Sequence, residues 1–414
     1  MTKISKLENL KKQWQAIMSC MGCGDCGYSI RPAVGRYLTC PVKESKDDEG
    51  FEIYFSRGRM NVLKSVLEGK LPLSRELAEF AYQCMECANC TEVCHETHNE
   101  NIVLNTSKWI DQVKVWDALR KDLIEAGYAP LDRHRDLVGN MKNDDMRNPY
   151  GEEINKKFEW LSEIPNIKNK GEYLFFAGCT MPLRQVDTLK NLMKILNIAG
   201  LEIAISKDEW CCGSIAARIG DYNTMEELMR HNITVFKDMG AKTVFTACAG
   251  CYRTLKKDYP ELLKEDLPFE VKHITETLIE LLKNNKIPFK STESEKLKVT
   301  YHDPCHLGRH MDLYEIPREV IAGIPGVELI EMKRNRKHSW CCGAGGGVKS
   351  QYPELALDIS KERINEAIKS GADILTTSCP FCIGNLKDAY EESEPEIKEK
   401  IKVVDLIDFL ASKI

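Results

Sequence analysis

The chain has 414 residues, of which 43% are hydrophobic and 29% charged, with a formal net charge of −5 and a pI near 6.1. The length suits roughly two or three domains, and the composition is ordinary for a folded protein with substantial cores. A charge so close to neutral gives no indication of binding to nucleic acid or to an anionic membrane surface.

The N-terminal stretch 1–15 is polar and amphipathic and lacks the apolar segment of a signal peptide. No later run approaches the ~18–20 consecutive apolar residues that a membrane span requires. We therefore expect a soluble, cytoplasmic protein without direct membrane insertion. Any peripheral attachment to a membrane would go through a partner subunit.

The eighteen cysteines of the chain need a chemical explanation. A disulfide framework is typical of small secreted proteins, whereas this sequence is long and has no export signal that we recognise. In a reducing compartment, cysteines at short fixed spacings indicate metal or redox sites. The sequence therefore predicts several metal or redox centres.

Eight cysteines form two sets near the N-terminus, each with three cysteines at three-residue steps and a fourth further along: Cys20, Cys23, Cys26 and Cys40, then Cys84, Cys87, Cys90 and Cys94. Three thiolates at this spacing can surround three corners of a cubane [4Fe–4S] cluster, and in two-cluster ferredoxins the fourth cysteine of each run ligates the other cluster. We therefore assign one cubane to Cys20, Cys23, Cys26 and Cys94, and the other to Cys84, Cys87, Cys90 and Cys40. Zinc is the alternative, although zinc sites normally take cysteines in pairs.

The segment between these two sets has apolar residues at helical spacing, with Gly69 as a stop signal. Because the triplets begin sixty-four residues apart, at Cys20 and Cys84, the pattern favours an all-helical ferredoxin-like domain over residues 1–104. Further helical patterns at 105–127 and 153–163 predict a helical linker region over 105–169.

The C-terminal half contains an internal repeat built around five cysteines in each copy: Cys179, Cys211, Cys212, Cys248 and Cys251, then Cys305, Cys341, Cys342, Cys379 and Cys382. Matching cysteines are offset by 126, 130 and 131 residues, and both adjacent pairs are preceded by tryptophan and followed by glycine. Such self-similarity indicates a duplication. It predicts two related domains, over 170–290 and 291–414.

Each copy alternates strand and helix patterns. The predicted strands are 172–178, 202–206, 243–248 and 270–274, then 297–303, 327–331, 373–378 and 401–405. This alternation predicts parallel sheets covered by helices, so the fold class is α + α/β. Ligands of such sheets bind beyond the carboxyl ends of the strands, where Cys179, Cys248, Cys305 and Cys379 fall.

Five cysteines are one more than a cubane needs. A non-cubane [4Fe–4S] cluster, opened or with a bridging thiolate, would use all five, and the adjacent pairs Cys211–Cys212 and Cys341–Cys342 favour it because they fit poorly at separate corners of a cubane. A cubane with one spare cysteine, or a zinc site, is the simpler alternative.

The spacing Cys-x31–35-CysCysGly-x34–35-CysxxCys, present twice, resembles that of CCG-domain proteins, and the whole chain resembles the family of heterodisulfide reductase D subunits. The resemblance implies that each five-cysteine set carries a non-cubane [4Fe–4S] cluster and that the disulfide between coenzyme M and coenzyme B is cleaved between the two. It implies a catalytic role for both five-cysteine sets, with electrons relayed through the two N-terminal cubanes.

Several other residues follow or precede cluster cysteines. His306 is a candidate proton donor, although it and His302 could instead hydrogen-bond a cluster sulfur or a strand end. Arg184, Arg253 and Arg309 lie two to five residues after a cysteine, where they could balance cluster charge or meet an anionic substrate.

The main rival function is electron relay. Iron–sulfur subunits of flavoprotein dehydrogenases that oxidise glycolate, lactate or glycerol 3-phosphate share the ferredoxin-plus-CCG plan, and they pass electrons to a quinone or carrier. We find no flavin, nicotinamide or phosphate-loop motif in the sequence. Either function therefore requires a redox partner, either a membrane protein of the cytochrome b type or a flavoprotein.

Overall fold

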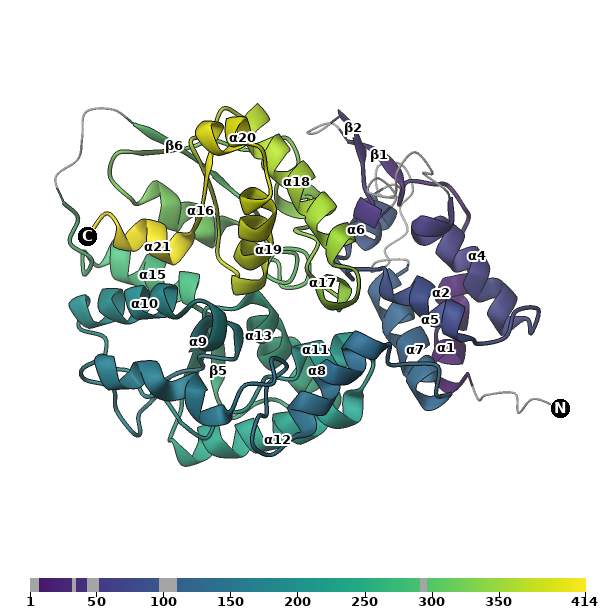
Figure 1. Cartoon of the computed structure of the whole chain (residues 1–414), viewed down its shortest axis with the longest axis horizontal. Coiled ribbons are helices and arrows are strands. Elements are labelled where there is room, and N and C mark those ends of the chain that lie inside the picture. Colours follow the sequence, from purple (N-terminus) through teal and green to yellow (C-terminus); the bar gives the residue numbers. More distant parts are fainter. Residues whose placement is uncertain (1–6, 32–34, 43–51, 97–109, 291–295) are drawn as a thin grey trace.

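The computed structural model describes residues 7–31, 35–42, 52–96, 110–290 and 296–414. Three parts follow one another along the chain: a mainly helical N-terminal region and two α/β units with parallel sheets (Figure 1). Within the described ranges, no helix combines the length and the apolar character needed to cross a bilayer.

The N-terminal region is mainly helical. Its elements are α1 (Glu8–Lys12), α2 (Trp14–Met18), β1 (Tyr28–Arg31), β2 (Gly35–Leu38), η1 (Glu52–Tyr54), α4 (Ser56–Leu67), α5 (Arg75–Tyr82), α6 (Asn89–Glu96), α7 (Gln112–Glu125), α8 (Asp132–Lys142) and the 3-10 helix η2 (Ile154–Glu163). Side chains cap two of the helices, because Ser74 accepts from the Leu77 N–H before α5 and Asp111 accepts from the Val113 N–H before α7. Gly69, the predicted stop signal, follows α4 with a φ of +73°.

The expectation of an all-helical N-terminal domain is wrong between Cys26 and Cys40. There β1 and β2 form an antiparallel hairpin with Tyr28 opposite Leu38. The aromatic and β-branched residues of this segment favour strands. The predicted boundary at residue 104 lies outside the described residues, as does the start of the helix expected over 105–127.

The linker segment 153–163 is helical but wound as a 3-10 helix. The indole N–H of Trp160 donates to the Lys157 carbonyl, which an α-helix would offer to the N–H of residue 161. This side-chain bond competes with the α-helical ladder and accounts for the tighter turn.

The first α/β unit has a parallel sheet of order β3-β4-β5. Its elements are β3 (Tyr173–Phe175), α9 (Thr180–Arg184), α10 (Val186–Ile198), α11 (Ser214–Ile219), α12 (Tyr222–Asp238), β4 (Thr243–Thr246), α13 (Ala249–Arg253), the π-helix η3 (Thr254–Asp258), α14 (Tyr259–Leu263), β5 (Glu270–His273) and α15 (Ile274–Lys283).

The second unit has a parallel sheet of order β7-β6-β8-β9. Its elements are β6 (Leu297–Tyr301), α16 (Glu315–Ala322), β7 (Val327–Leu329), η4 (Arg336–His338), α17 (Val348–Gln351), α18 (Pro353–Lys369), β8 (Ile374–Thr377), α19 (Pro380–Glu391), α20 (Pro395–Lys400), β9 (Lys402–Asp405) and α21 (Leu406–Ala411). The first residues of the predicted domain 291–414, up to 295, lie outside the described residues.

The two sheets repeat each other except at one strand. The segment 202–206, the counterpart of β7, was expected to be a strand but forms isolated bridges from Ala204 to Leu174 and Lys168. Its backbone bonds are divided between β3 on one side and Lys168 on the other, so no continuous ladder develops. That expectation is therefore wrong in detail, although the segment lies beside β3 at the edge of the sheet.

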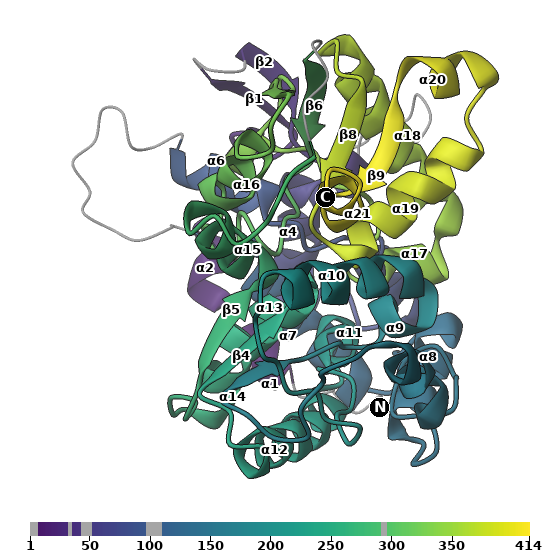
Figure 2. The same ribbon diagram turned by 90° about the vertical axis from the view of Figure 1, so that its left-hand side faces the viewer.

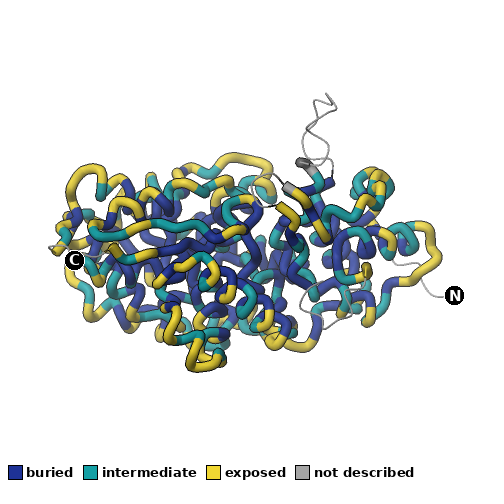
Figure 3. The backbone as a smooth tube through the Cα atoms, turned by 90° about the horizontal axis from the view of Figure 1, so that it is seen from above, coloured by how far each residue is buried: buried dark blue, intermediate teal, exposed yellow. Residues whose placement is uncertain are grey.

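The two units pack through equivalent helices, with α10 against α21 and α15 against α16 (Figure 2). Apolar side chains from both units share one core there, among them Leu192, Leu278, Val320 and Phe409. A second core joins the N-terminal region to the first unit, so buried backbone continues along the molecule (Figure 3).

Arg120 of α7 donates hydrogen bonds to all three parts of the chain. Its fully buried guanidinium donates to the carbonyls of Cys84 in the N-terminal region, Arg218 in the first unit and Gly346 in the second. Its Nη1 also lies 2.8 Å from the carboxylate of Glu86, which is buried as well.

We expect Arg120→Met to destabilise the protein by about 3–5 kcal/mol, because Glu86 and several carbonyls would stay buried without their partner. Thermal unfolding followed by circular dichroism measures this as a lower midpoint temperature. Arg135→Met on α8, where the side chain is 65% exposed, is the matched control. Equal midpoints for the two variants would contradict the joining role of Arg120.

Candidate iron–sulfur site

The first predicted cubane set lines one pocket, to which the structure brings Cys20, Cys23, Cys26 and Cys94. The loop after α2 curls around this pocket because Gly22 and Gly24 adopt φ angles of +73° and +93°. Arg57 fixes the loop by donating to the Gly22 carbonyl. Cys23 is exposed, so the pocket is open to the outside of the molecule.

The second predicted cubane set lies directly behind the first. Burial and the neighbouring thiols of Cys84, Cys87, Cys26 and Cys40 raise the pKa of Cys90 well above its usual value. These neighbours come from both N-terminal runs, so the two sets adjoin at Cys26 and Cys40. The assignment of Cys40 to the second cubane agrees with its place beside Cys90 and stays a prediction.

In the first α/β unit, the five cysteines converge beyond the carboxyl ends of the strands. Cys179 follows β3, and Cys248 follows β4 and accepts from the Cys251 N–H. Neighbouring thiols lie in contact in the order Cys179, Cys211, Cys212, Cys251 and Cys248.

The second unit repeats this arrangement. Its thiols lie in contact in the order Cys305, Cys341, Cys342, Cys382 and Cys379. The glycines after the adjacent pairs, Gly213 and Gly343, have φ angles of +80° and +89°. A Cβ at Gly343 would lie 2.4 Å from the Ala356 carbonyl oxygen, so only glycine fits there.

Contacts also connect one set to the next. The thiol of Cys87, in the second N-terminal set, lies against that of Cys341 in the second unit. The thiol of Cys379 in the second unit in turn lies against that of Cys248 in the first. The four cysteine sets therefore form a continuous series from the exposed Cys23 to the buried Cys179.

The chemistry of these donors fits iron–sulfur clusters. Nine of the ten cysteines in the two α/β units are buried, and all are free of disulfides. Thiolates buried at contact distance repel one another strongly unless positive charge lies among them. Iron ions would supply that charge, and sulfur-only sets of four and five are suitable ligands for it.

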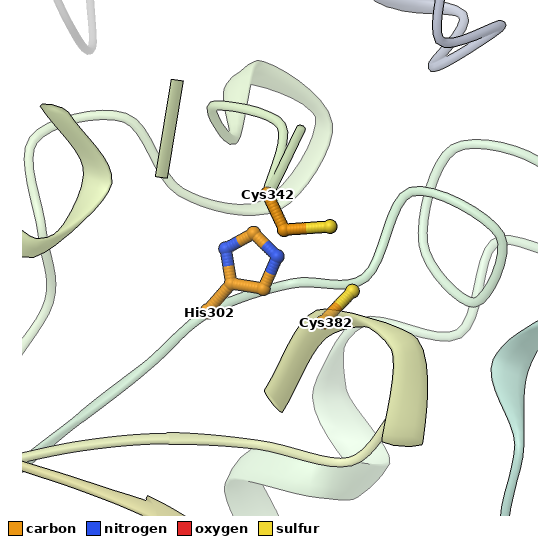
Figure 4. Close-up of side chains that lie close together, drawn as sticks. All are labelled: His302, Cys342 and Cys382. Carbon is orange, nitrogen blue, oxygen red and sulfur yellow. The ribbon is translucent and has the colours of Figure 1, made fainter. Parts of the chain in front are cut away.

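His302 lies beside the cysteines of the second unit. Its ring nitrogen and the sulfurs of Cys342 and Cys382 lie within 4.8 Å of one another (Figure 4). Arg363 donates to Nδ1 at 3.1 Å, so the neutral ring carries its hydrogen on Nε2, which has no hydrogen-bond partner among the described residues. The hydrogen bond from His302 to a cluster sulfur therefore stays a prediction.

His306, the candidate proton donor, sits between the two units. Arg253 of the first unit lies 3.2 Å from its Nε2, and since arginine can only donate, the hydrogen of the neutral ring is on Nδ1. Burial and the charge of Arg253 lower the pKa of His306 well below its usual value. A methyl group on Gly250 would lie 3.7 Å from Nδ1 and 3.6 Å from the Cys248 sulfur, so both face the same small space.

Sequence reasoning missed a buried ion pair at the first unit's set. Lys157 and Glu209 are each 1% exposed, and Lys157 Nζ lies 2.8 Å from the Glu209 carboxylate. The charges of Cys179 and Cys211 act on Lys157, so its ammonium group lies close to these thiols. Nothing in the sequence around Lys157 signals this, because the residue comes from η2, far from any cysteine motif.

Arg184 does not take part in the cysteine sets as a charge partner. Its guanidinium lies 3.3 Å from the Glu152 carboxylate and is 42% exposed. Arg309, in contrast, is buried and acts electrostatically on Cys87, Cys305 and Cys341. Of the arginines singled out in the sequence, Arg253 and Arg309 therefore lie at the site.

Comparison with known proteins supports the duplication. The family model of the cysteine-rich CCG domain matches twice, over residues 173–256 and 299–387. The D subunit of the dihydromethanophenazine:CoB–CoM heterodisulfide reductase of Methanosarcina mazei is 37% identical, and the match covers 97% of this chain and 95% of that protein.

More distant relatives are also iron–sulfur or redox proteins. The B subunit of the CoM/CoB fumarate reductase of Methanothermobacter marburgensis is 31% identical over 97% of this chain and 74% of its own length. An EtfAB:quinone oxidoreductase of Syntrophomonas wolfei is 29% identical over 80% of this chain and 46% of its own length.

The likeness to the Methanosarcina protein extends over nearly the full length of both chains and includes the duplicated cysteine-rich domain. The chain is an iron–sulfur oxidoreductase subunit and belongs to the family of heterodisulfide reductase D subunits.

Proposed function

We propose that this protein reduces a small-molecule disulfide of the coenzyme M–coenzyme B type with electrons relayed through its N-terminal cysteine sets. The observation that carries the proposal is the unbroken series of thiol contacts, in which Cys87 meets Cys341 and Cys379 meets Cys248. The series begins at the exposed Cys23 and ends at the two buried five-cysteine sets. Electrons from a partner subunit could therefore enter at the surface and pass inward from set to set.

The ligand assignment is supported by the pocket that the first set lines and by the thiols that surround Cys90. Cys20, Cys23, Cys26 and Cys94 would hold one cubane [4Fe–4S] cluster, and Cys40, Cys84, Cys87 and Cys90 the other. The two five-cysteine sets would each hold a further [4Fe–4S] cluster of non-cubane form. When bound, these clusters supply one-electron transfer.

The order of the contacts makes the two α/β units unequal. The second unit touches the N-terminal sets through Cys341, and the first unit is reached through the second at Cys248 and Cys379. Disulfide cleavage takes up two electrons and two protons and yields two thiols. We infer that the disulfide is cleaved where both units meet, because each of its sulfurs would then face one of the two sets.

His306 would stabilise a product thiolate at this junction. Arg253 holds its Nε2, which leaves a hydrogen on Nδ1, the atom that faces the space beside Cys248. The ring belongs to the second unit but reaches the first, so it lies where a product thiolate would form. Because burial and Arg253 keep the ring neutral, we assign to it a hydrogen bond from Nδ1 to that thiolate, while the two protons that the cleavage consumes come from solvent.

Electron relay in a flavoprotein complex is the second candidate. The likeness to the EtfAB:quinone oxidoreductase favours it, because that protein's name describes electron transfer to a quinone. The chain covers only 46% of that protein, compared with 95% of the Methanosarcina protein. This difference in coverage favours disulfide reduction, with a membrane protein of the cytochrome b type or a flavoprotein as the donor.

Replacing Cys211 and Cys341 together by alanine should abolish disulfide reduction and leave the N-terminal clusters in place. Iron content should fall from about sixteen to about eight atoms per chain, and the cubane signals in electron paramagnetic resonance should remain. Unchanged turnover by the double variant would refute the proposal.

Cys87→Ala should separate electron delivery from substrate chemistry. We expect turnover with the partner donor to fall by more than about tenfold, since a ligand at the contact with Cys341 is lost. Small-molecule reductants that reach the α/β units directly should still reduce the clusters there. A variant that keeps full turnover with the partner would show that electrons enter by another route.

Oxidised protein mixed with coenzyme M thiol distinguishes the two candidate functions. A new paramagnetic signal that depends on the thiol supports a substrate site at a five-cysteine cluster. Absence of such a signal, together with about sixteen irons per chain, supports electron relay.

A further inference from the structure

A buried lysine lies beside the five-cysteine set of the first unit. Lys157 of η2 is 1% exposed, and its Nζ donates to the Glu209 carbonyl at 3.0 Å and lies 2.8 Å from the Glu209 carboxylate. This carboxylate also accepts from the N–H of Gly178, the residue directly before Cys179. Because Glu209 itself stands two residues before Cys211, the ion pair connects the two loops that carry these cysteines.

The charge of this lysine acts on the sulfurs of both loops. The neighbouring thiol of Cys211 and burial raise the pKa of Cys179, and Lys157 opposes that rise. The pKa of Cys211 is lowered by its neighbouring thiols, and Lys157 adds to that effect. Burial lowers the pKa of Lys157 itself, but the attraction of Glu209 and Cys179 outweighs it, so the ammonium group is charged.

The segment 147–157 makes further contacts with the same loops. The Arg147 carbonyl accepts from the Cys211 N–H at 3.0 Å, and the Tyr150 hydroxyl lies 2.9 Å from that of Thr180, which begins α9. The lysine therefore belongs to a segment that is bonded to the cysteine loops at several points, and its position does not depend on the ion pair alone.

The duplication does not repeat this ion pair. The residue 130 positions after Glu209 is Ser339, which is neutral. Lys157 lies outside both matches of the cysteine-rich CCG domain model, which cover residues 173–256 and 299–387. A segment outside the duplicated domain thus supplies the charge to one copy of it.

A fixed cation beside a redox site favours the reduced form, because reduction adds negative charge. The interaction is strong where water is excluded, and both members of the pair are 1% exposed. The ammonium group acts on the thiols, whereas the carboxylate is bonded to backbone N–H groups, so the positive charge prevails at the cysteines. Local charge of this kind is one of the properties that set the potentials of iron–sulfur clusters.

We propose that Lys157 raises the reduction potential of the iron–sulfur site in the first unit, so that electrons arriving through the second unit collect there. The inference rests on the proposed function for the presence of a cluster at this site. It adds a residue that controls how electrons distribute between the two units. In the step concerned, the site of the first unit gains one electron from that of the second, and Lys157 keeps its proton and its charge.

Redox titration of the holoprotein with dithionite, followed by electron paramagnetic resonance, measures the midpoint potential of each cluster. In K157M one midpoint should fall by at least about 59 mV, a tenfold change in the equilibrium constant for one electron, because a buried positive charge is lost. In E209Q the same midpoint should rise, because the opposing charge is lost. A purely structural disturbance would not give shifts of opposite sign.

The C211A variant identifies the site. It removes a ligand from the first unit, so the midpoint that moves in K157M and E209Q should be missing from C211A. The double variant K157M/E209Q leaves no unpaired buried charge, and it therefore covers the case in which K157M alone does not fold. Its midpoint should also fall, though by less than that of K157M.

The matched control is an exposed ion pair on the same helix. Lys156 pairs with Glu152 at 3.0 Å, and the two side chains are 55% and 28% exposed. K156M and E152Q should leave every midpoint in place, because water screens these charges. The proposal is overturned if K157M/E209Q leaves the midpoints unchanged, if K157M and E209Q shift them in the same direction, if the shifted midpoint persists in C211A, or if the controls give the same shifts.

The titration uses no disulfide, so its outcome is independent of the proposed reaction. Opposite shifts in K157M and E209Q, in a protein that reduces no disulfide, would uphold the inference and refute the reaction. Full turnover with unchanged midpoints in both variants would uphold the reaction and refute the inference.

Discussion

Cysteine thiols are buried in this protein so close together that they cannot all ionise unless positive charge lies among them. The five thiols of each α/β unit lie next to one another, and Cys87 and Cys248 extend the contacts from one part of the chain to the next. Like charges at such distances in a low-dielectric interior repel strongly. Iron would remove that repulsion, and the fold arranges the thiols so that one metal-binding set lies beside another.

The surrounding structure is shaped by this requirement. Parallel strands end at the cysteines, so Cys179, Cys248 and Cys379 reach the same region from different strands. Gly343 permits a turn that any side chain would block. Buried cations, Lys157 at the first unit and Arg309 at the second, lie next to the thiols. Each unit thus has its own source of positive charge, although the two sources are not related by the duplication.

This difference makes the repeated units chemically distinct. The second unit contacts the N-terminal sets and contributes His302 and His306, whereas the first contributes Arg253. Helix packing between α10 and α21 and between α15 and α16 is close to symmetric. The packing of the two units is therefore nearly symmetric, whereas the residues at the site differ between them. Such a site suits a substrate with two different ends and electrons that arrive from one side.

The sequence by itself determined the cysteine sets, the duplication and the parallel strands, because these depend on short spacings and on local hydrophobic patterns that do not change with context. It misjudged the segment between Cys26 and Cys40, where strand-forming residues make a hairpin, and the segment 202–206, whose backbone bonds are divided between two neighbours. Only the tertiary structure decided that Cys87 meets Cys341, that Lys157 reaches Cys179 and that Arg309 lies against Cys87. Such contacts join residues far apart in the chain, and they depend on how helices and sheets pack, which no local spacing encodes.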